Sequence, residues 1–323
     1  MSRKLISLTI AASLLAGTAL ADVPRVAADI APVHSLVARV MDGLGAPDLI
    51  IDSGASPHEY ALRPSQAAAL QNADIVFWVS PDLTPWLDGA IAALAGDAQS
   101  VTFLDIPGTR VLPFREGALF EAHDHGNDAN DDHADEDDHD DHADEADHDD
   151  HDHGAADPHA WLSPDNAAVW LNTIAASLSA ADPDNAGAYF ANAAAGRAEL
   201  ATLSAEVANI LDPLQDRNFI VFHDAYQYFE QAFDFPATGA ISMSDAREPS
   251  PARIAEIRGI IADRDVTCIL SEPQFNPGRV ALVLDGSGAQ TAVLDPLGSD
   301  LEPGAGLYPR MIRNLATTLA DCL

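Results

Sequence analysis

Basic residues are scarce in this sequence. It has 16 lysines and arginines against 51 aspartates and glutamates, and its one lysine is Lys4. The formal net charge of −35 at pH 7 repels other polyanions at long range. We therefore expect no binding to nucleic acid and no attraction to an anionic membrane surface.

Long apolar runs are equally scarce. Only Leu5–Gly17 comes near, and it is shorter than the ~20 residues that cross a bilayer. This run follows two basic residues and precedes Ala19-Leu20-Ala21, the layout of a secretory signal peptide. We predict a signal peptide over residues 1–21, cleaved after Ala21, and export to the periplasm without stable membrane insertion. Cleavage would remove two positive charges and lower the formal charge from −35 to −37. The alternative is an uncleaved membrane anchor.

Cysteine is limited to Cys268 and Cys322. An even count in an oxidising compartment predicts a disulfide between them. Two buried free thiols are the alternative. A metal site built on this pair is disfavoured, because neither cysteine lies in a CxxC spacing.

What the sequence does contain is an alternation of short β-branched runs and helical patterns, which predicts parallel βαβ units. The expected strands are 25–30, 48–52, 74–79, 101–106, 218–223, 236–240, 267–273 and 291–295. The expected helices are 33–42, 64–72, 83–95, 226–233, 251–263, 277–284 and 308–320. The fold class is therefore α/β, with two doubly wound lobes over 22–180 and 214–323.

A connecting segment over 181–213 separates the two lobes. It is rich in alanine and has no internal proline, and Asp182 and Pro183 form a typical helix start. Pro213 is expected to end the helix. At 1.5 Å per residue, its ~28 residues would make one long rigid helix on the order of 40 Å, long enough to bridge both lobes. A helix packed within one domain is the alternative.

The segment 121–156 has a different composition from the rest. Between residues 123 and 154 it holds eight of the twelve histidines and sixteen acidic residues. Low hydrophobicity and high charge predict disorder, and irregular spacing favours many weak, exchangeable metal sites over one defined tetrahedron. We expect an accessory metal loop formed by His123, His125, His133, His139, His142, His148, His151 and His153. A solvated tail with incidental binding, or calcium buffering by the carboxylates, are the alternatives.

Four histidines lie outside that loop. His58, His159 and His223 each follow or close an expected strand, whereas His34 lies inside a helical pattern and is expected to be a packing residue. Ligands of open α/β sheets bind beyond the carboxyl ends of the strands. Asp295, which closes the last strand, occupies an equivalent place. Three imidazoles with a carboxylate or water form a common tetrahedral zinc shell, so we predict a metal site in the cleft between the lobes.

Several blocks also resemble a known family. The segments "GASPHEYALRPSQ", "NADIVFWVSPDL", "HAWLSPDNA", "FIVFHDAYQYFE", "CILSEPQFNP" and "LDPLG" look like the ZnuA-type zinc-binding proteins of bacterial ABC importers. The resemblance covers nearly all of the mature chain, in order. It implies two α/β lobes bridged by one long helix, zinc between them, and an acidic, histidine-rich loop in the first lobe. It also implies His58, His159 and His223 as ligands, and a cognate ABC permease with its ATPase as partners. We further expect a monomer.

The fourth ligand stays open. Related metal binders use an aspartate at the position of Asp295, while other zinc members use water or a carboxylate beside the first histidine, which here is Glu59. We rank Asp295 first, water second and Glu59 third. Three imidazoles favour Zn²⁺, whereas Mn²⁺ prefers more oxygen ligands.

Three function classes fit a secreted metal binder. A zinc-binding protein that supplies an ABC importer is the prediction, and a manganese-type receptor is the variant with another metal. A zinc hydrolase would also use three protein ligands, but no HExxH or comparable motif is present, so we predict no enzyme. An adhesin or an extracellular zinc buffer would not stimulate uptake through a permease.

Overall fold

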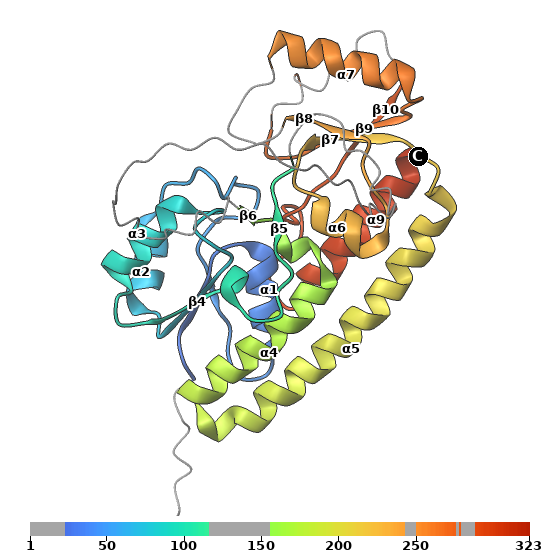
Figure 1. The fold of residues 1–323 in the computed structure, drawn as a ribbon. Coiled ribbons are helices and arrows are strands. Elements are labelled where there is room, and N and C mark those ends of the chain that lie inside the picture. The colour runs from blue at the N-terminus through green and yellow to red at the C-terminus, as the bar shows by residue number, and fades with distance from the viewer. Residues whose placement is uncertain (1–22, 116–155, 243–249, 276–277, 279–287) are drawn as a thin grey trace, which may run out of the picture.

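The computed structural model describes residues 23–115, 156–242, 250–275, 278 and 288–323 (Figure 1). The predicted signal peptide, the eight loop histidines and most of the helix expected at 277–284 lie outside these residues.

The first lobe is built on a parallel sheet in the order β2-β1-β3-β4. Its strands are β1 (Val26–Ala28), β2 (Asp48–Leu49), β3 (Ile75–Trp78) and β4 (Gln99–Thr102). Its helices are α1 (Ala31–Val40), α2 (Pro64–Asn72) and α3 (Pro85–Leu94). Every residue of β3 is buried, as expected for a central strand of a parallel sheet. The chain leaves β2 three residues earlier than predicted, and β4 gives way to a 3₁₀ turn at Phe103–Asp105.

The second lobe repeats this arrangement with a parallel sheet in the order β10-β9-β7-β8. Its strands are β7 (Phe219–His223), β8 (Gly239–Ser242), β9 (Cys268–Ser271) and β10 (Gln290–Val293). Its helices are α6 (Gln227–Phe233), α7 (Pro251–Asp263) and α9 (Leu307–Cys322). The predicted disulfide is confirmed, because Cys268 and Cys322 are bonded and tie β9 to the end of α9.

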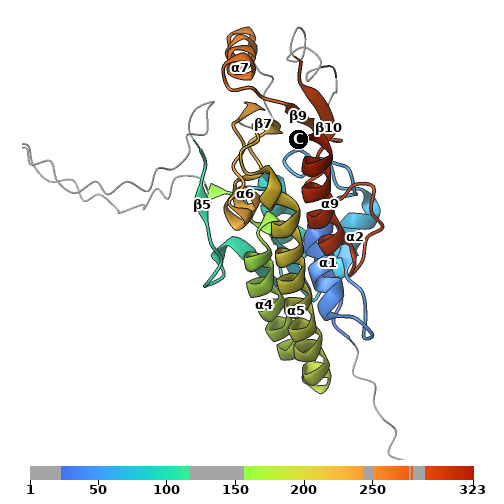
Figure 2. The same ribbon diagram turned by 90° about the vertical axis from the view of Figure 1, so that its right-hand side faces the viewer.

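Two long helices follow the first lobe, and the second of them connects it to the second lobe. α4 (Pro164–Ala181) begins with the Ser163 hydroxyl accepting a hydrogen bond from the Asn166 amide, and it runs antiparallel to α5 (Ala186–Leu211). The helix expected from Pro183 starts with a 3₁₀ turn, a common form of a helix N-terminus. The 26 residues of α5 span about 39 Å. α5 contacts α1 and α4 on the first lobe and α6 and α9 on the second (Figures 1 and 2), which confirms the bridging helix.

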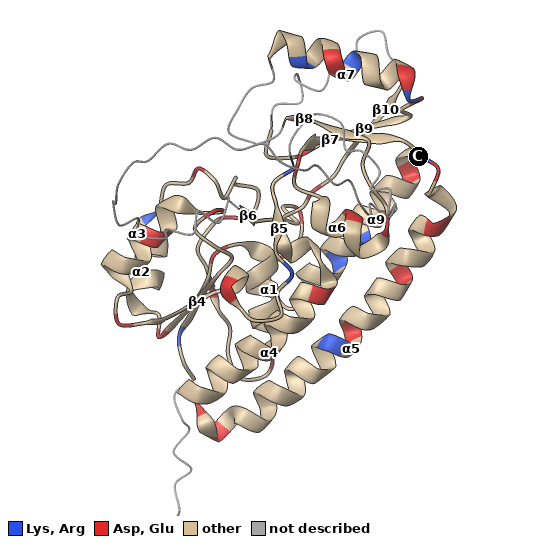
Figure 3. Ribbon diagram, in the orientation of Figure 1, with Lys and Arg blue, Asp and Glu red and all other residues tan. Residues whose placement is uncertain are grey.

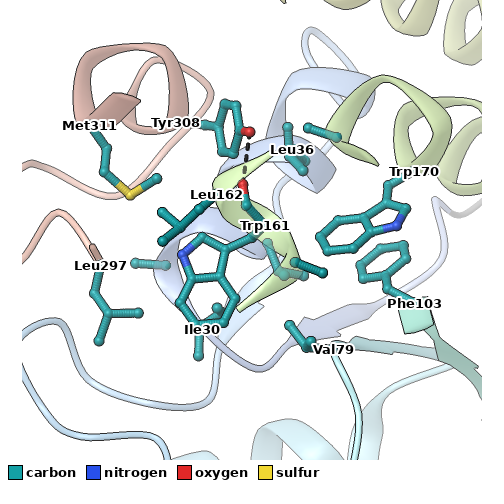
Figure 4. Close-up of a cluster of buried hydrophobic side chains, with 14 of the residues drawn as sticks. Ile30, Leu36, Val79, Phe103, Trp161, Leu162, Trp170, Leu297, Tyr308 and Met311 are labelled. Carbon is teal, nitrogen blue, oxygen red and sulfur yellow. Dashed lines mark hydrogen bonds between the residues drawn. The ribbon is translucent and has the colours of Figure 1, made fainter. Parts of the chain in front are cut away.

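The hydrophobic core is continuous across both lobes. Figure 4 shows Trp161 and Leu162 of the first half packed beside Tyr308 and Met311 of α9, with the Tyr308 hydroxyl donating to the Trp161 carbonyl at 2.8 Å. A second, smaller cluster lies between the second sheet and α7. Figure 3 shows acidic segments scattered over both lobes and fewer basic ones, on a ribbon that is mostly uncharged. None of the helices in the described ranges has both the length and the apolar character needed to span a bilayer.

A small antiparallel ribbon lies between the lobes. It pairs β5 (Leu112–Pro113) with β6 (Ala156–Asp157). The histidine-rich insertion leaves the chain after β5 and rejoins it at β6, so this ribbon is the base of that insertion.

Candidate metal centre

Three histidines meet where the lobes face each other. His223 is the last residue of β7, His159 precedes a 3₁₀ turn at Ala160–Leu162, and His58 lies in the long loop after β2. One ring nitrogen of each lies within 4.8 Å of the others. His159 and His223 are 4% and 5% exposed, and His58 is half-buried. Residues far apart in the chain thus bring three imidazoles to one point.

Two buried carboxylates orient two of these rings. The Nδ1 atom of His159 lies 2.7 Å from Asp157, and the Nδ1 atom of His223 lies 2.6 Å from Glu272. In their ionised form these carboxylates only accept hydrogen bonds, which places the proton of each ring on Nδ1. Each Nε2 atom is then left with its lone pair available to a metal ion. This carboxylate–histidine pairing is the usual support of a metal-ligating imidazole.

The distance between the two Nε2 atoms fits a bound cation. They are 3.4 Å apart. At this short distance the two nitrogen lone pairs repel each other unless a cation lies between them. In a tetrahedral zinc site with Zn–N bonds of 2.0–2.1 Å, neighbouring nitrogens are about 3.3–3.4 Å apart. The rings are therefore already spaced for a tetrahedral ion.

Burial also shifts the ionisation of the supporting carboxylate. Desolvation raises the pKa of Asp157 to about 7, although the hydrogen bond from the His159 amide and the nearby Arg115, His223 and His58 act in the opposite direction. A dication at the imidazoles would favour the charged carboxylate further. The ionised form of Asp157 and a cation at the imidazoles therefore favour each other.

The pocket around the imidazoles is small. Its cavity volume is about 20 Å³, whereas one water needs at least 10–15 Å³. Trp161 of the first half and Phe275 of the second form part of its wall. This space suits an ion with one small ligand, and the pocket is partly open to solvent.

Asp295 stays outside the group of three. Among the described residues, the only cluster spaced for a metal ion is formed by the histidines. The Asp295 carboxylate instead accepts hydrogen bonds from the amides of Leu297, Gly298 and Ser299 in the loop that follows β10. Glu59 is exposed and is also absent from the cluster. Neither carboxylate that sequence reasoning ranked as a fourth ligand is brought to the imidazoles.

Sequence reasoning missed Asp157 and Glu272. Both could have been found, since Asp157 stands two residues before His159 and Glu272 directly follows β9, the neighbour of the strand that carries His223. The prediction for His34 is confirmed: it is 8% exposed, and its Nε2 atom lies 3.0 Å from the Pro47 carbonyl oxygen.

Comparison with known proteins gives a consistent result. Residues 26–322 match the family model described as ZnuA, zinc-uptake complex component A, periplasmic. The high-affinity zinc uptake system protein ZnuA of Brucella abortus is 44% identical over 331 residues, covering 99% of each chain. ZnuA of Paracoccus denitrificans is 44% identical over 322 residues, covering 98% of each.

Solved structures show the same fold. A crystal structure of ZnuA has a TM-score of 0.72 at 24% identity, covering 93% of this chain and 99% of that one. A ZnuA deletion mutant with zinc bound has a TM-score of 0.72 at 25% identity, covering 93% and 98%. The match to the family model extends over both lobes and over all three clustered histidines. The chain therefore belongs to the ZnuA family of periplasmic zinc-uptake components.

Proposed function

We propose that this protein captures Zn²⁺ with His58, His159 and His223 and delivers it to the permease and ATPase of an ABC importer. The observation that carries the proposal is the 3.4 Å separation of the His159 and His223 Nε2 atoms, with both Nδ1 atoms bound to buried carboxylates. The curated relatives, named as high-affinity zinc uptake proteins, support the transport role.

We propose water as the fourth ligand. The Asp295 carboxylate is already bound by three loop amides and a serine hydroxyl. The cavity beside the imidazoles has room for a water-sized ligand. Three nitrogens and one water suit Zn²⁺ better than Mn²⁺, which prefers a shell richer in oxygen.

Binding requires no chemical step. Zn²⁺ displaces protons from imidazoles, so its affinity should fall as the pH drops below about 6. Structural zinc sites reach apparent binding energies of ~10–16 kcal/mol. A value in this range would allow capture from trace metal and would require the permease to assist release.

Alanine variants of the three histidines test the site. A competition titration against a zinc chelator should show a loss of at least ~100-fold in affinity for each, because each removes one of four ligands. His34→Gln is the matched control, since it changes a buried histidine outside the site and should leave zinc affinity unchanged. An alanine variant with wild-type affinity would remove that residue from the shell.

We propose that the histidine-rich insertion is an accessory capture segment. It rejoins the chain at β6, three residues before His159. Deletion of residues 123–153 should remove low-affinity zinc equivalents in a titration and leave one tight site. Loss of the tight site in a folded deletion variant would contradict this role.

We also propose that residues 1–21 direct export and that the mature protein is monomeric. N-terminal sequencing of periplasmic protein should begin at Asp22, and sedimentation should give one mass near that of the single chain. A retained leader or a dimer would contradict one of these two points.

A further inference from the structure

The β5–β6 ribbon is bound to the second lobe by α6. The Tyr228 hydroxyl accepts a hydrogen bond from the Leu112 amide at 2.9 Å and donates one to the Asp157 carbonyl at 2.7 Å. One side chain of α6 therefore bonds both strands of the ribbon. Tyr228 is 1% exposed, so both bonds are shielded from water.

Arg115, which follows β5, makes a second and stronger attachment. Its guanidinium donates to both Asp224 oxygens, with Nε at 3.0 and 3.1 Å, and to both Glu230 oxygens at 2.7 and 3.1 Å. The Arg115 side chain is 14% exposed, and the two carboxylates are 2% and 5% exposed. Burial alone would lower the pKa of Arg115, but the hydrogen bonds that it donates to Glu230 and Asp224 outweigh burial and raise the pKa, so the guanidinium stays charged.

Both attachments lead directly to zinc-site histidines. Asp224 is the residue after His223, and Asp157 of the ribbon is the residue whose carboxylate holds Nδ1 of His159. Arg115 thus ties the strand beside Asp157 to the backbone beside His223. These contacts cross between the lobes and flank the Nε2 atoms that lie 3.4 Å apart.

We propose that Arg115 is a positioning residue for metal binding, which holds His159 and His223 at tetrahedral spacing by latching the β5–β6 ribbon to Asp224 and Glu230; this inference rests on the proposed function. The latch is the set Arg115, Tyr228, Asp224 and Glu230. Arg115 touches no metal. It acts through the two segments that carry the ligands.

The chemistry of the latch requires arginine. Two buried carboxylates side by side repel each other, and removal of their cation leaves uncompensated buried charge. A planar guanidinium can bind two carboxylates in fixed geometry, whereas a lysine ammonium is a point charge on a flexible stem. A lysine at this position should therefore keep the charge balance but should not hold the ribbon in a fixed position against Asp224 and Glu230.

Arg115→Met, Arg115→Lys and Tyr228→Phe test the latch in the full chain. The matched control is Arg39→Met, because Arg39 also makes two hydrogen bonds to a carboxylate, that of Glu199, and its side chain is 16% exposed, but it lies away from the pocket. Zinc affinity and dissociation rate are measured by chelator competition. The visible spectrum of bound Co²⁺ reports tetrahedral geometry, and thermal unfolding of the metal-free form reports the fold.

We expect Arg115→Met to weaken zinc binding at least ~10-fold, chiefly through faster dissociation, and to alter the Co²⁺ spectrum, as for other supports of metal ligands. Arg115→Lys should fall between Met and wild type. Tyr228→Phe should weaken binding without a change of charge. Arg39→Met should match wild type in zinc affinity and spectrum, whatever its effect on unfolding.

Wild-type affinity and spectrum in both Arg115→Met and Tyr228→Phe would overturn the latch. If Arg115→Met does not fold, Arg115→Lys and Tyr228→Phe decide the question on the same readouts. His223→Ala is measured in parallel. Full zinc affinity in that variant would refute the proposed function itself, whereas lost binding in His223→Ala with intact binding in the latch variants would refute the latch alone.

Discussion

The carboxylate behind His223 offers the sharpest test of the site's electrostatics. Glu272→Gln keeps an oxygen that can accept from Nδ1 but removes the negative charge. Glu272 is 4% exposed and lies 2.6 Å from Nδ1 of His223. A zinc ion on the opposite ring nitrogen would lie about 6.5 Å from that carboxylate, allowing for a Zn–N bond of ~2 Å.

The size of the effect follows from that distance. A zinc ion of charge +2 and a carboxylate of charge −1, about 6.5 Å apart, attract each other by roughly 5 kcal/mol at an effective dielectric constant of 20. About half is offset when His223 is protonated before zinc binds, because the same carboxylate also attracts the single proton that zinc then displaces. The remaining ~2.5 kcal/mol corresponds to an affinity loss within the 10–100-fold range that is typical when such a supporting residue is replaced.

The assay is a competition titration at constant pH and ionic strength, with Co²⁺ spectra as a check on geometry. Glu206→Gln is the control, because it removes an equal charge from an exposed pair between α5 and α9. We expect a loss of 10–100-fold for Glu272→Gln and none for Glu206→Gln. If Glu272→Gln stays within twofold of wild type while folded, the charge behind His223 has no role in metal affinity.

Three further outcomes are expected. Asp295→Asn should change zinc affinity less than about threefold and lower stability to urea by about 1–2 kcal/mol, since it weakens bonds to loop amides; a loss above ~100-fold in affinity would make Asp295 a ligand after all. Burial lowers the pKa of His34, so its neutral form stabilises the fold above the unfolded pKa of 6.5 and this stability is lost as the pH falls below it. Urea melts of zinc-free protein should thus show a smaller acid loss for His34→Gln than for wild type, and equal losses would refute this. Replacing Cys268 and Cys322 with serine should lower the free energy of unfolding by up to roughly 4 kcal/mol, since the disulfide closes a loop of 54 residues. A guanidinium unfolding midpoint unchanged from wild type would contradict this prediction.

Sequence patterns pointed to the three clustered histidines because of their positions next to expected strands. β7 is a continuous apolar run that ends in His223, and parallel strands bring their carboxyl ends to one edge. The long helix was equally visible, since an alanine-rich stretch between two prolines has few other conformations open to it. Its first turn was misplaced because a 3₁₀ turn and an α-helical turn share the same capping residues.

The role of Asp295 was not accessible in this way. Because Asp295 lies at a strand end, the sequence makes it look like a ligand, as it does for the histidines. In the structure, three amides of the turn after β10 donate hydrogen bonds to its carboxylate. These hydrogen bonds depend on the backbone dihedral angles of four residues, which a periodic sequence pattern does not reveal. Arg115 was hidden for a related reason: it borders the acidic insertion and reads as a surface charge, although its partners come from 109 and 115 residues away.

A chamber of about 20 Å³ also restricts the form in which cargo can enter. Citrate, amino acids and peptides carry zinc as bulky complexes, and none of these fits beside the three rings. The chelating molecule must release its zinc, or transfer it ligand by ligand at the opening of the pocket, before the ion reaches the three rings. The rate of loading in a chelator-rich medium would then depend on how fast the chelator gives up its zinc.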